Sequence, residues 1–488
     1  MKFTSMKTYF IITILFIGSI LPGCKKTLEE KPVTFISPSS FFTNAASYES
    51  AVIGVYSDVP GMYGYNPYML LEMCTDIYGQ PSPSAEQALP MYQNAPSPVY
   101  YNTINAWGSA YTLIKDANFI LDNLAGAGID NGKKAQFTAE ARFLRGFAYF
   151  YLVQLYGDVP LRKTTIRSYG DVQIPRTSQD SIYSFILDDL NYAESNLPAD
   201  APQQGRVYKL AATALLAKVY LTMAGNPLNK TAYYTNARDK ALEVINSGKF
   251  RLLDDFSAVF HNTAYTTESI WEKLYVPANG GNPLHSMSCP AAQYLPILVP
   301  ATWFINSFSP GDQRKAWGIQ QTYKDPGGNT LAPYFQKFVN NTAIDQGVGP
   351  SSSGLGPLTA YTSPYLRLAE MYLIAAEGEN EVNGPGNAYQ YINKIRWRAR
   401  VDKSSPAEVP DLAGLTQAQF RDSVWLERKH ELSQEGSTWF DLKRTGTFGN
   451  IQAIRGGGLV NPVGPYNNTW LIPYTEFVAN NIPQNPLY

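Results

Sequence analysis

One segment limits the possible folds of this chain more than any other, because it is apolar around its whole circumference and yet carries two arginines. Residues 139–161 read AEARFLRGFAYFYLVQLYGDVPL. The spacing predicts a helix that ends at Gly157, with Pro160 preventing a restart. A helix that is apolar all round lies between neighbours on several sides. Arg142 and Arg145 share a stripe of this helix, because residues three apart face the same way.

These two arginines have two interpretations. They could form an anion site, or they could lock this helix to another one through ion pairs. We expect the lock, because a buried guanidinium requires a charged partner. The carboxylates that we consider as partners are Glu370, Glu377, Glu427 and Asp441.

Helical patterns also dominate the rest of the chain and indicate a mainly α scaffold. Apolar residues recur three and four positions apart in further segments, namely 107–118, 181–197, 210–224, 233–246, 368–379, 388–398 and 417–431. The segments 208–246 and 366–396 alternate small and large residues as tetratricopeptide helix pairs do, although a generic all-α core also produces this pattern. Irregular stretches at 60–100, 262–365 and 445–488 interrupt the scaffold, with short strands expected at 269–276 and 334–339.

The charge balance disfavours partners that are bound mainly through electrostatics. The chain carries 39 Lys and Arg against 40 Asp and Glu, for a net charge of -1. This balance favours neither nucleic acid nor an anionic membrane face as a partner. Tyrosine, with 34 residues, outnumbers phenylalanine with 23 and tryptophan with 8. Because tyrosine has an apolar face and a polar tip, it suits half-exposed aromatic surfaces.

The first residues predict export and lipidation. Lys2 and Lys7 give a positive start, and residues 10–20 are apolar but too short to span a bilayer. Leu21-Pro22-Gly23-Cys24 follows and resembles the bacterial lipobox. The resemblance implies lipid on Cys24, whereas an ordinary signal peptide with an incidental cysteine is the alternative. Two or more acyl chains give stable attachment to a membrane.

The chain is therefore expected to divide into three parts. Residues 1–23 are a lipoprotein signal peptide, residues 24–40 a lipidated tether, and residues 41–488 a single domain. Once Cys24 is acylated, Cys74 and Cys289 remain. They could form one disulfide in an oxidising compartment or stay as two buried thiols.

Several motifs in a fixed order resemble the SusD/RagB-type outer-membrane lipoproteins. The central one joins RFLRGFAY at 142–149 to LYGDVPL at 155–161. The other matching segments are Thr75-Asp76, the helix with Trp107, Tyr111, Ile114 and Asn118, Asp312 with Arg314, 366–370, 395–400, Glu427-Arg428 with Glu431, 439–444, and the closing residues 471–473 and 484–488. Each motif is modest alone, but their shared order covers essentially the whole chain from Cys24.

The resemblance implies both a fold and a role. The fold is a mainly α bundle with about four tetratricopeptide-like helix pairs and a loop-rich half with a few short strands. The resemblance also implies that the protein is not an enzyme. From the residues themselves we expect no cofactor and no metal, because the chain has only three histidines. It is lipid-anchored in the outer membrane, facing the cell exterior, where it captures an oligosaccharide or polysaccharide and helps to deliver it to a SusC-like TonB-dependent transporter.

The candidate ligand residues lie in the loop insertions at about 60–105 and 262–365. Aromatic faces stack on the C–H faces of sugar rings, and amide side chains at the rim bind hydroxyls. The rings proposed for stacking are Tyr63, Tyr65, Tyr78, Tyr92, Tyr294 and Trp303. The polar side chains proposed for the rim are Gln93, Asn94, Asn282 and Gln293.

Two other classes of function remain as alternatives. The first is a surface glycoside hydrolase, which requires two carboxylates across a cleft, although no local motif suggests such a pair. The second is a tetratricopeptide-type scaffold that binds only peptide or protein.

A zinc protease is not among these alternatives. The run His430-Glu431-Leu432-Ser433-Gln434 begins like the zinc-protease motif but has Gln434 where the second His is required.

Overall fold

The computed structural model describes most of the predicted domain. The described residues are 38–79, 101–275, 281–288, 298–324, 328, 330–331, 333–339, 359–451 and 468–485. The predicted signal peptide, nearly all of the tether with Cys24, and Cys289 lie outside them. Cys74 is half-buried directly after helix α5.

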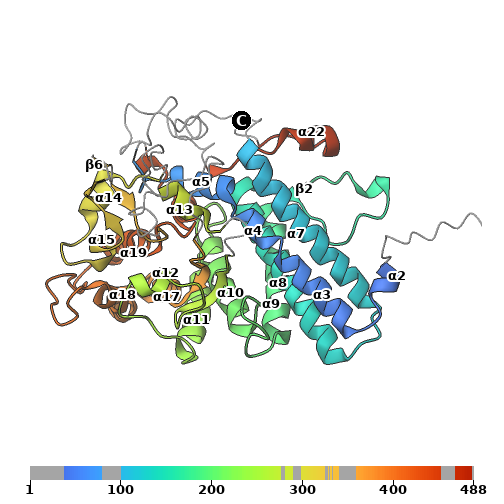
Figure 1. Ribbon diagram of the computed structural model, residues 1–488, viewed down its shortest axis with the longest axis horizontal. Helices are drawn as coiled ribbons and strands as arrows, with labels where there is room; N and C mark the ends of the chain where they lie inside the picture. The colour runs from blue at the N-terminus through green and yellow to red at the C-terminus, as the bar shows by residue number, and fades with distance from the viewer. Residues whose placement is uncertain are drawn as a thin grey trace, which may run out of the picture.

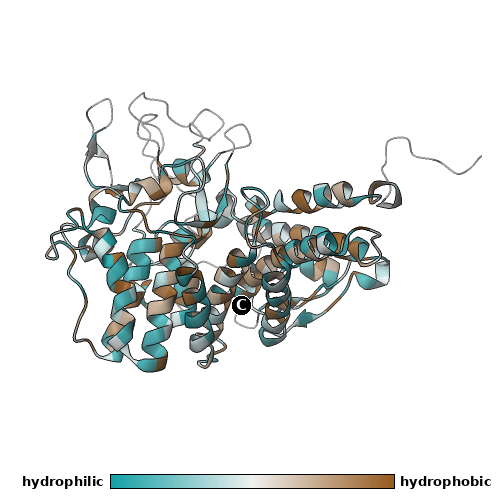
Figure 2. Cartoon of the chain, turned by 90° about the horizontal axis from the view of Figure 1, so that it is seen from below, coloured by the Kyte–Doolittle hydropathy of each residue, from teal (hydrophilic) through white to brown (hydrophobic). Residues whose placement is uncertain are grey.

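Long helices packed side by side form the body of the protein (Figure 1), which confirms the predicted mainly α class. In chain order each of α7 to α11 packs against the next, and α11 then packs against α17. The helices of this series are α7 (Tyr101–Ala125), α8 (Asn131–Tyr156), α9 (Gln179–Asn196), α10 (Lys209–Ala224), α11 (Tyr233–Asn246), α17 (Leu368–Asn383), α18 (Pro385–Ala399) and α19 (Gln417–Leu432). The two paired segments identified in the sequence are α10 with α11 and α17 with α18. Polar residues colour the outward sides of the helices, and apolar residues the sides between them (Figure 2).

Helix α8 is the opening segment of the sequence, and it is buried as predicted. Every residue from Phe143 to Tyr156 is buried. The helix begins after Asp130, whose side chain accepts a hydrogen bond from the Lys133 backbone N–H. It ends at Gly157, whose φ of 73° lies in the region that favours glycine.

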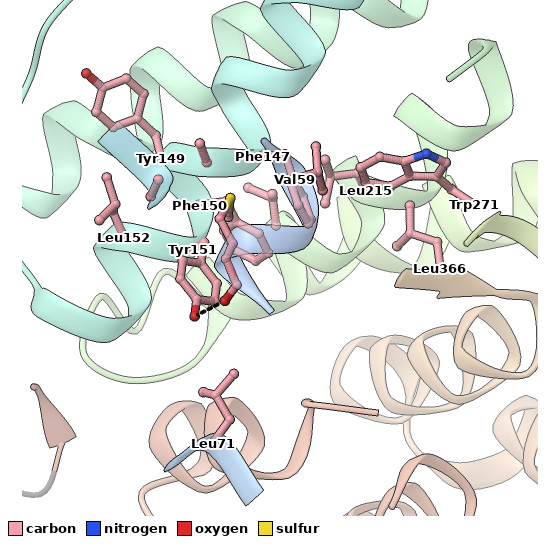
Figure 3. Packing of buried hydrophobic residues seen from close by; sticks show 14 of the residues in the cluster. Val59, Leu71, Phe147, Tyr149, Phe150, Tyr151, Leu152, Leu215, Trp271 and Leu366 are labelled. Carbon is pink, nitrogen blue, oxygen red and sulfur yellow. Dashed lines mark hydrogen bonds between the residues drawn. The ribbon is translucent and has the colours of Figure 1, made fainter. Parts of the chain in front are cut away.

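The rings of α8 organise the main hydrophobic core (Figure 3). Phe147 packs edge-to-face on Trp271, with 5.0 Å between the ring centroids. The Tyr151 hydroxyl donates to the Met62 carbonyl oxygen at 2.7 Å, so the polar tip of this buried ring is satisfied. Helices and strands contact α8 on several sides. This is why the helix carries buried aromatic residues around its whole circumference.

The two arginines of α8 form the predicted lock, but with different carboxylates. Arg145 donates to both carboxylate oxygens of Asp189 at 2.8 Å, and Arg142 bonds Asp189 as well as Asp188. Both aspartates belong to α9, which follows α8 in the chain and approaches it closely at Gly146. The four carboxylates named from the sequence were wrong as partners, because they lie in networks around Arg314, Arg396, Arg428, Arg444 and Lys218.

A buried ion network holds α15 (Gln313–Ala316), α18, α19 and the strand β8 together. Arg314 Nη1 lies 2.6 Å from Glu427 Oε1, and Arg367 Nη1 lies 2.6 Å from Glu431 Oε1. Arg398 of α18 pairs with the same Glu431. Each of these side chains is at most 1 % exposed. The network thus adds ion pairs to the apolar cluster that α17, α18 and α19 share.

The remaining elements are short. The helices are α2 (Pro38–Phe41), α3 (Ala45–Tyr56), α4 (Val59–Met62), α5 (Tyr65–Met73), α12 (Ser257–Phe260), α13 (Pro283–Ser288), α14 (Thr302–Ser307), α20 (Thr438–Thr445) and α22 (Tyr474–Asn480), with a 3-10 turn at Tyr169–Asp171. Antiparallel strands pair as β1 (Val159–Pro160) with β2 (Arg176–Thr177), β3 (Ser269–Lys273) with β8 (Ser363–Arg367), β4 (Ile319–Gln320) with β7 (Tyr334–Phe335), and β5 (Tyr323–Lys324) with β6 (Thr330–Leu331). Strands β3 and β7 confirm the two strand positions expected from the sequence.

The expected loop at 60–100 was wrong in its described part. Residues 60–79 contain the end of α4 and the whole of α5, and residues 68–73 pack into the core. The glycines, prolines and asparagines of this stretch suggested a loop, but the apolar run YMLLEM supplies a buried helical face. Within the ranges given above, no helix is both long and apolar enough to cross a membrane.

Candidate functional site

A groove between α14, α19 and α20 is the candidate site, because it combines two indoles with polar side chains. Its volume is about 440 Å³. We call it the tryptophan groove, and its lining residues are Asp76, Trp303, Trp425, Leu426, Lys429, Asp441, Leu442, Arg444, Thr445, Thr447 and Asn450. Two indoles and two leucines give it an apolar floor, while charged groups, hydroxyls and an amide supply polar contacts.

Trp303 is held rigidly at one wall of the groove. It lies on α14 and is half-buried, and its indole N–H donates to the Asp76 carbonyl oxygen at 2.7 Å. Lys429 Nζ lies 5.6 Å from the ring centroid and forms an ion pair with the Asp76 carboxylate. The indole is thus held in one orientation, and a preorganised side chain lowers the entropic cost of binding wherever it contacts a ligand.

Trp425 is fixed in a similar way from α19. Its indole N–H donates to Glu377 Oε1 at 3.1 Å, and the residue is half-buried. Glu377 belongs to the neighbouring α17, so the contact ties the indole to the helical body. Both tryptophans therefore have their single polar atom bonded within the protein, which leaves ring surface rather than an N–H for recognition.

The charged groups of the groove are already paired, either with one another or with charged residues directly beside the groove. Arg444 Nη2 donates to Glu377 Oε2 at 2.8 Å, and Arg444 Nε donates to Asp441 Oδ1 at 2.7 Å. Arg428 Nε reaches the second oxygen of Asp441 at 2.8 Å. Although burial opposes it, the charges of Arg428 and Arg444 lower the pKa of Asp441 to about 2. Asp441 is consequently ionised at neutral pH.

Comparison with known proteins identifies the family of the chain. Residues 188–470 match the model of the SusD family, and residues 28–221 match a model described as starch-binding, associating with the outer membrane. The chain belongs to the SusD family. It is 27% identical to SusD-like protein P25 of Formosa agariphila over 98% of both chains.

Solved structures of SusD-family proteins share the fold. A SusD homolog from Bacteroides thetaiotaomicron has a TM-score of 0.78 and 25% identity, covering 92% of this chain and 98% of its own. A laminarin-binding SusD-like protein has a TM-score of 0.74 and 23% identity, covering 92% of this chain and 100% of its own. The tetratricopeptide-like helical architecture predicted from the resemblance is thereby confirmed.

Of the predicted ligand residues whose side chains the structure describes, Trp303 lines the groove, and Tyr63, Tyr78 and Asn282 do not. Tyr78 is 1% exposed, and its hydroxyl donates to Glu72 Oε2 at 2.5 Å. Asn282 is fully buried, donates to the Tyr361 carbonyl oxygen and accepts from the Leu284 N–H at the start of α13. Both are interior residues, which corrects the expectation that they lie on exposed loops.

Tyr63 is likewise part of an aromatic cluster rather than of an open loop. Its ring centroid lies 5.2 Å from those of Tyr151 and Tyr365, and Lys273 Nζ lies 4.7 Å from it. The cluster covers the ring because α4 and α5 pack on the core. Of the other predicted residues, the structure describes the backbone but not the side chain of Tyr65, and Tyr92, Gln93, Asn94, Gln293 and Tyr294 lie outside the described residues.

Sequence reasoning missed the second tryptophan of this SusD-family groove. Trp425 lies within the helical segment 417–431, where an aromatic residue is usually assigned to the core. A polar neighbourhood on the same helix, with Arg421, Asp422 and Lys429, was the available signal that one face of α19 is not fully covered. Asn450 and Thr447 follow α20 in a segment that the sequence identified only as turns.

Proposed function

We propose that this protein binds an oligosaccharide or polysaccharide in the tryptophan groove and does not cleave it. The supporting observation is the pair of pinned indoles beside the polar groups of Asn450, Thr445 and Thr447. Sugar rings present C–H faces that pack on aromatic faces, while their hydroxyls bind amides and hydroxyls. Membership of a family whose models include starch-binding proteins agrees with this ligand class.

The carboxylates of the groove do not suit hydrolysis. A glycosidase needs one carboxyl group that stays protonated at working pH, and therefore one with a raised pKa. Asp441 has a lowered pKa, and Asp76 is paired with Lys429. Burial raises the pKa of Glu72 and Glu272 to about 7, but both are interior residues that do not line the groove.

A serine–histidine contact near the groove does not suit nucleophilic catalysis either. Ser307 Oγ lies 2.8 Å from His430 Nε2, which superficially resembles a nucleophile with its base. Burial together with the positive charge of Arg314 lowers the pKa of His430 to about 3, so the imidazole is a weak base. The ring is also stacked on Phe308 at 4.0 Å. Among the described residues no group of His, Cys, Asp and Glu side chains could hold a metal ion.

The cellular role follows from the N-terminal motif and the family together. Lipid on Cys24 would hold the protein at a membrane. We take this to be the outer membrane, because the description of one matching family model names that membrane. Facing the cell exterior, the groove would concentrate a glycan near a SusC-like TonB-dependent transporter. Capture and delivery, without bond cleavage, is the function that we assign.

A glycan array tests this function directly. The soluble chain lacking residues 1–24 is screened, and its best ligand is titrated by calorimetry against Trp303→Ala and Trp425→Ala. Each variant is expected to lose about fivefold or more in affinity, because stacking on one aromatic ring contributes on the order of 1 kcal/mol or more.

Trp397→Ala is the matched control, because Trp397 is a half-buried tryptophan of α18 that does not line the groove. Its affinity should equal that of the unchanged protein. Release of reducing ends, or equal affinity in all three variants, would contradict the proposal.

A further inference from the structure

The charged side chains that line the tryptophan groove bear on whether it can bind an anionic glycan. Two cations line it, Lys429 and Arg444. Lys429 forms an ion pair with Asp76, and Arg444 pairs with both Glu377 and Asp441. Within the described residues, then, neither cation is left with an unmatched charge for an anionic ligand.

Burial strengthens this pairing. The side chain of Arg444 is 4% exposed and that of Lys429 is 12% exposed. To bind a sulfate or a uronate, either cation would have to leave its carboxylate, and an unpaired buried carboxylate is costly. The neighbouring Arg428 is 2% exposed and bonded to Asp441 and Glu370, so it does not supply a spare charge to the groove.

The acceptors of the groove point the same way. Asp76 and Asp441 both line it, and Asp76 Oδ1 is buried without a hydrogen bond from any described residue. An acceptor of this kind needs a donor, and sugar hydroxyls are donors. A carboxylate or sulfate ester brings only acceptors and a negative charge, which Asp76 and Asp441 repel.

We infer that the groove is selective for uncharged, hydroxyl-rich glycans and rejects uronate-containing or sulfated ones. This inference rests on the proposed function. Recognition then depends on stacking over Trp303 and Trp425 and on neutral hydrogen bonds. The affinity of such binding varies little with ionic strength. By contrast, binding through ion pairs between protein cations and an anionic glycan weakens as the salt concentration rises.

The test compares neutral and acidic polysaccharides on the soluble chain lacking residues 1–24. The neutral probes are laminarin, starch, xylan and dextran, and the acidic probes are polygalacturonate, alginate and carrageenan. We expect binding to at least one neutral probe, with an affinity that changes less than about twofold between about 0.05 and 0.5 M salt, and no binding to the acidic probes.

The two ways of failing are distinguishable. Binding of an acidic probe that is lost in Trp303→Ala would overturn the charge inference while supporting a glycan site in the groove. Absence of binding to every probe, or binding that Trp303→Ala and Trp425→Ala leave unchanged, counts against the proposed function itself.

An Asp76→Asn variant provides a gain-of-function check. It keeps the backbone carbonyl that holds Trp303 but removes the counter-ion of Lys429. If paired charge is what excludes anions, this variant should gain measurable, salt-sensitive binding to polygalacturonate. The control Asp422→Asn changes an exposed carboxylate of α19 outside the groove and should gain none. A properly folded Asp76→Asn protein without the gain contradicts the inference.

Discussion

At the scale of single residues, this protein buries many charges and satisfies them in pairs. Asp189 is fully buried and receives hydrogen bonds from both Arg142 and Arg145. A buried carboxylate is tolerable only with such partners, because desolvation of an isolated charge costs several kcal/mol. These residues hold α8 against α9, so their role is structural rather than ligand binding.

Replacing Arg145 tests this interpretation. Arg145→Met should lower the free energy of unfolding by about 2–3 kcal/mol. A buried carboxylate that loses its one charged partner typically costs ~3–5 kcal/mol, and the loss is smaller here because Arg142 still bonds Asp189. Arg167→Met removes an exposed pair with Asp122 and should cost less than ~1 kcal/mol. Urea unfolding followed by circular dichroism measures both, and equal losses would contradict the account.

At the scale of elements, close helix packing depends on small residues at particular crossings. At Gly378 of α17, an added Cβ would lie 2.9 Å from the Tyr234 carbonyl oxygen of α11 and 2.9 Å from Arg238 Cβ. The first of these neighbours is backbone and does not move aside easily. The α11–α17 contact joins the two tetratricopeptide-like pairs, so this glycine fixes how one pair stacks on the next.

A substitution at this crossing has a defined expected effect. Gly378→Ala should destabilise the protein by about 1–3 kcal/mol, because the added methyl overpacks a tight contact. Gly386→Ala in α18 meets no atom within 4 Å and should instead stabilise it by about 0.4–1 kcal/mol. Thermal unfolding of the two variants compares them, and similar shifts of the same sign in both would rule out the packing explanation.

The elements also show which features could be predicted from sequence. The periodicity of α8 and its Gly157 stop were sufficient to predict a helix buried on all sides. The partners of Arg142 and Arg145 were not predictable, because an ion pair depends on which helices are neighbours, and charge type alone does not specify that. Tyr63 and Tyr78 were misplaced for a related reason, since a tyrosine near Gly and Pro has the same local signal in an exposed loop and in a connection packed on the core, such as the end of α4 or the bridge from Tyr78 to Pro300.

At the scale of the whole molecule, ion pairing around α19 ties stability to pH. Although burial opposes it, Arg314 and Arg396 lower the pKa of Glu427 to about 2, below the value of about 4.3 expected in the unfolded chain. A carboxyl with a lowered native pKa contributes stability above its unfolded pKa and loses it as pH falls toward its native one. The expected loss therefore occurs between about pH 4.5 and pH 2.

This prediction separates one carboxyl from the general effect of acid. The lowered pKa of Glu427 corresponds to about 3 kcal/mol of stability at neutral pH. In Glu427→Gln, the decrease in the free energy of unfolding between about pH 4.5 and pH 2 should therefore be smaller by about 3 kcal/mol. Asp422→Asn, on the exposed side of the same helix, should leave the slope unchanged. Denaturant titrations at several pH values measure the slopes, and parallel curves for Glu427→Gln and the unchanged protein would show that this pairing does not set the acid limit.

The whole molecule presents its candidate site where a rigid helical frame meets the segments that connect it. The frame was predictable because long periodic helices dominate the chain. The tryptophan groove was only partly predictable, since Trp303 was identified from its aromatic character, whereas Trp425 joins it only once α14 and α19 are placed side by side. That juxtaposition, together with the N–H contacts that pin both rings, is what makes the groove a candidate glycan site.

The most direct measurement is oxidative footprinting of tryptophan, read by mass spectrometry, with and without a bound polysaccharide at saturation. The account predicts that ligand reduces the labelling of Trp303 and Trp425 together, while Trp397 on α18 is labelled at the same rate in both states. Saturating binding with unchanged labelling of Trp303 and Trp425 would show that the glycan is held elsewhere on the protein.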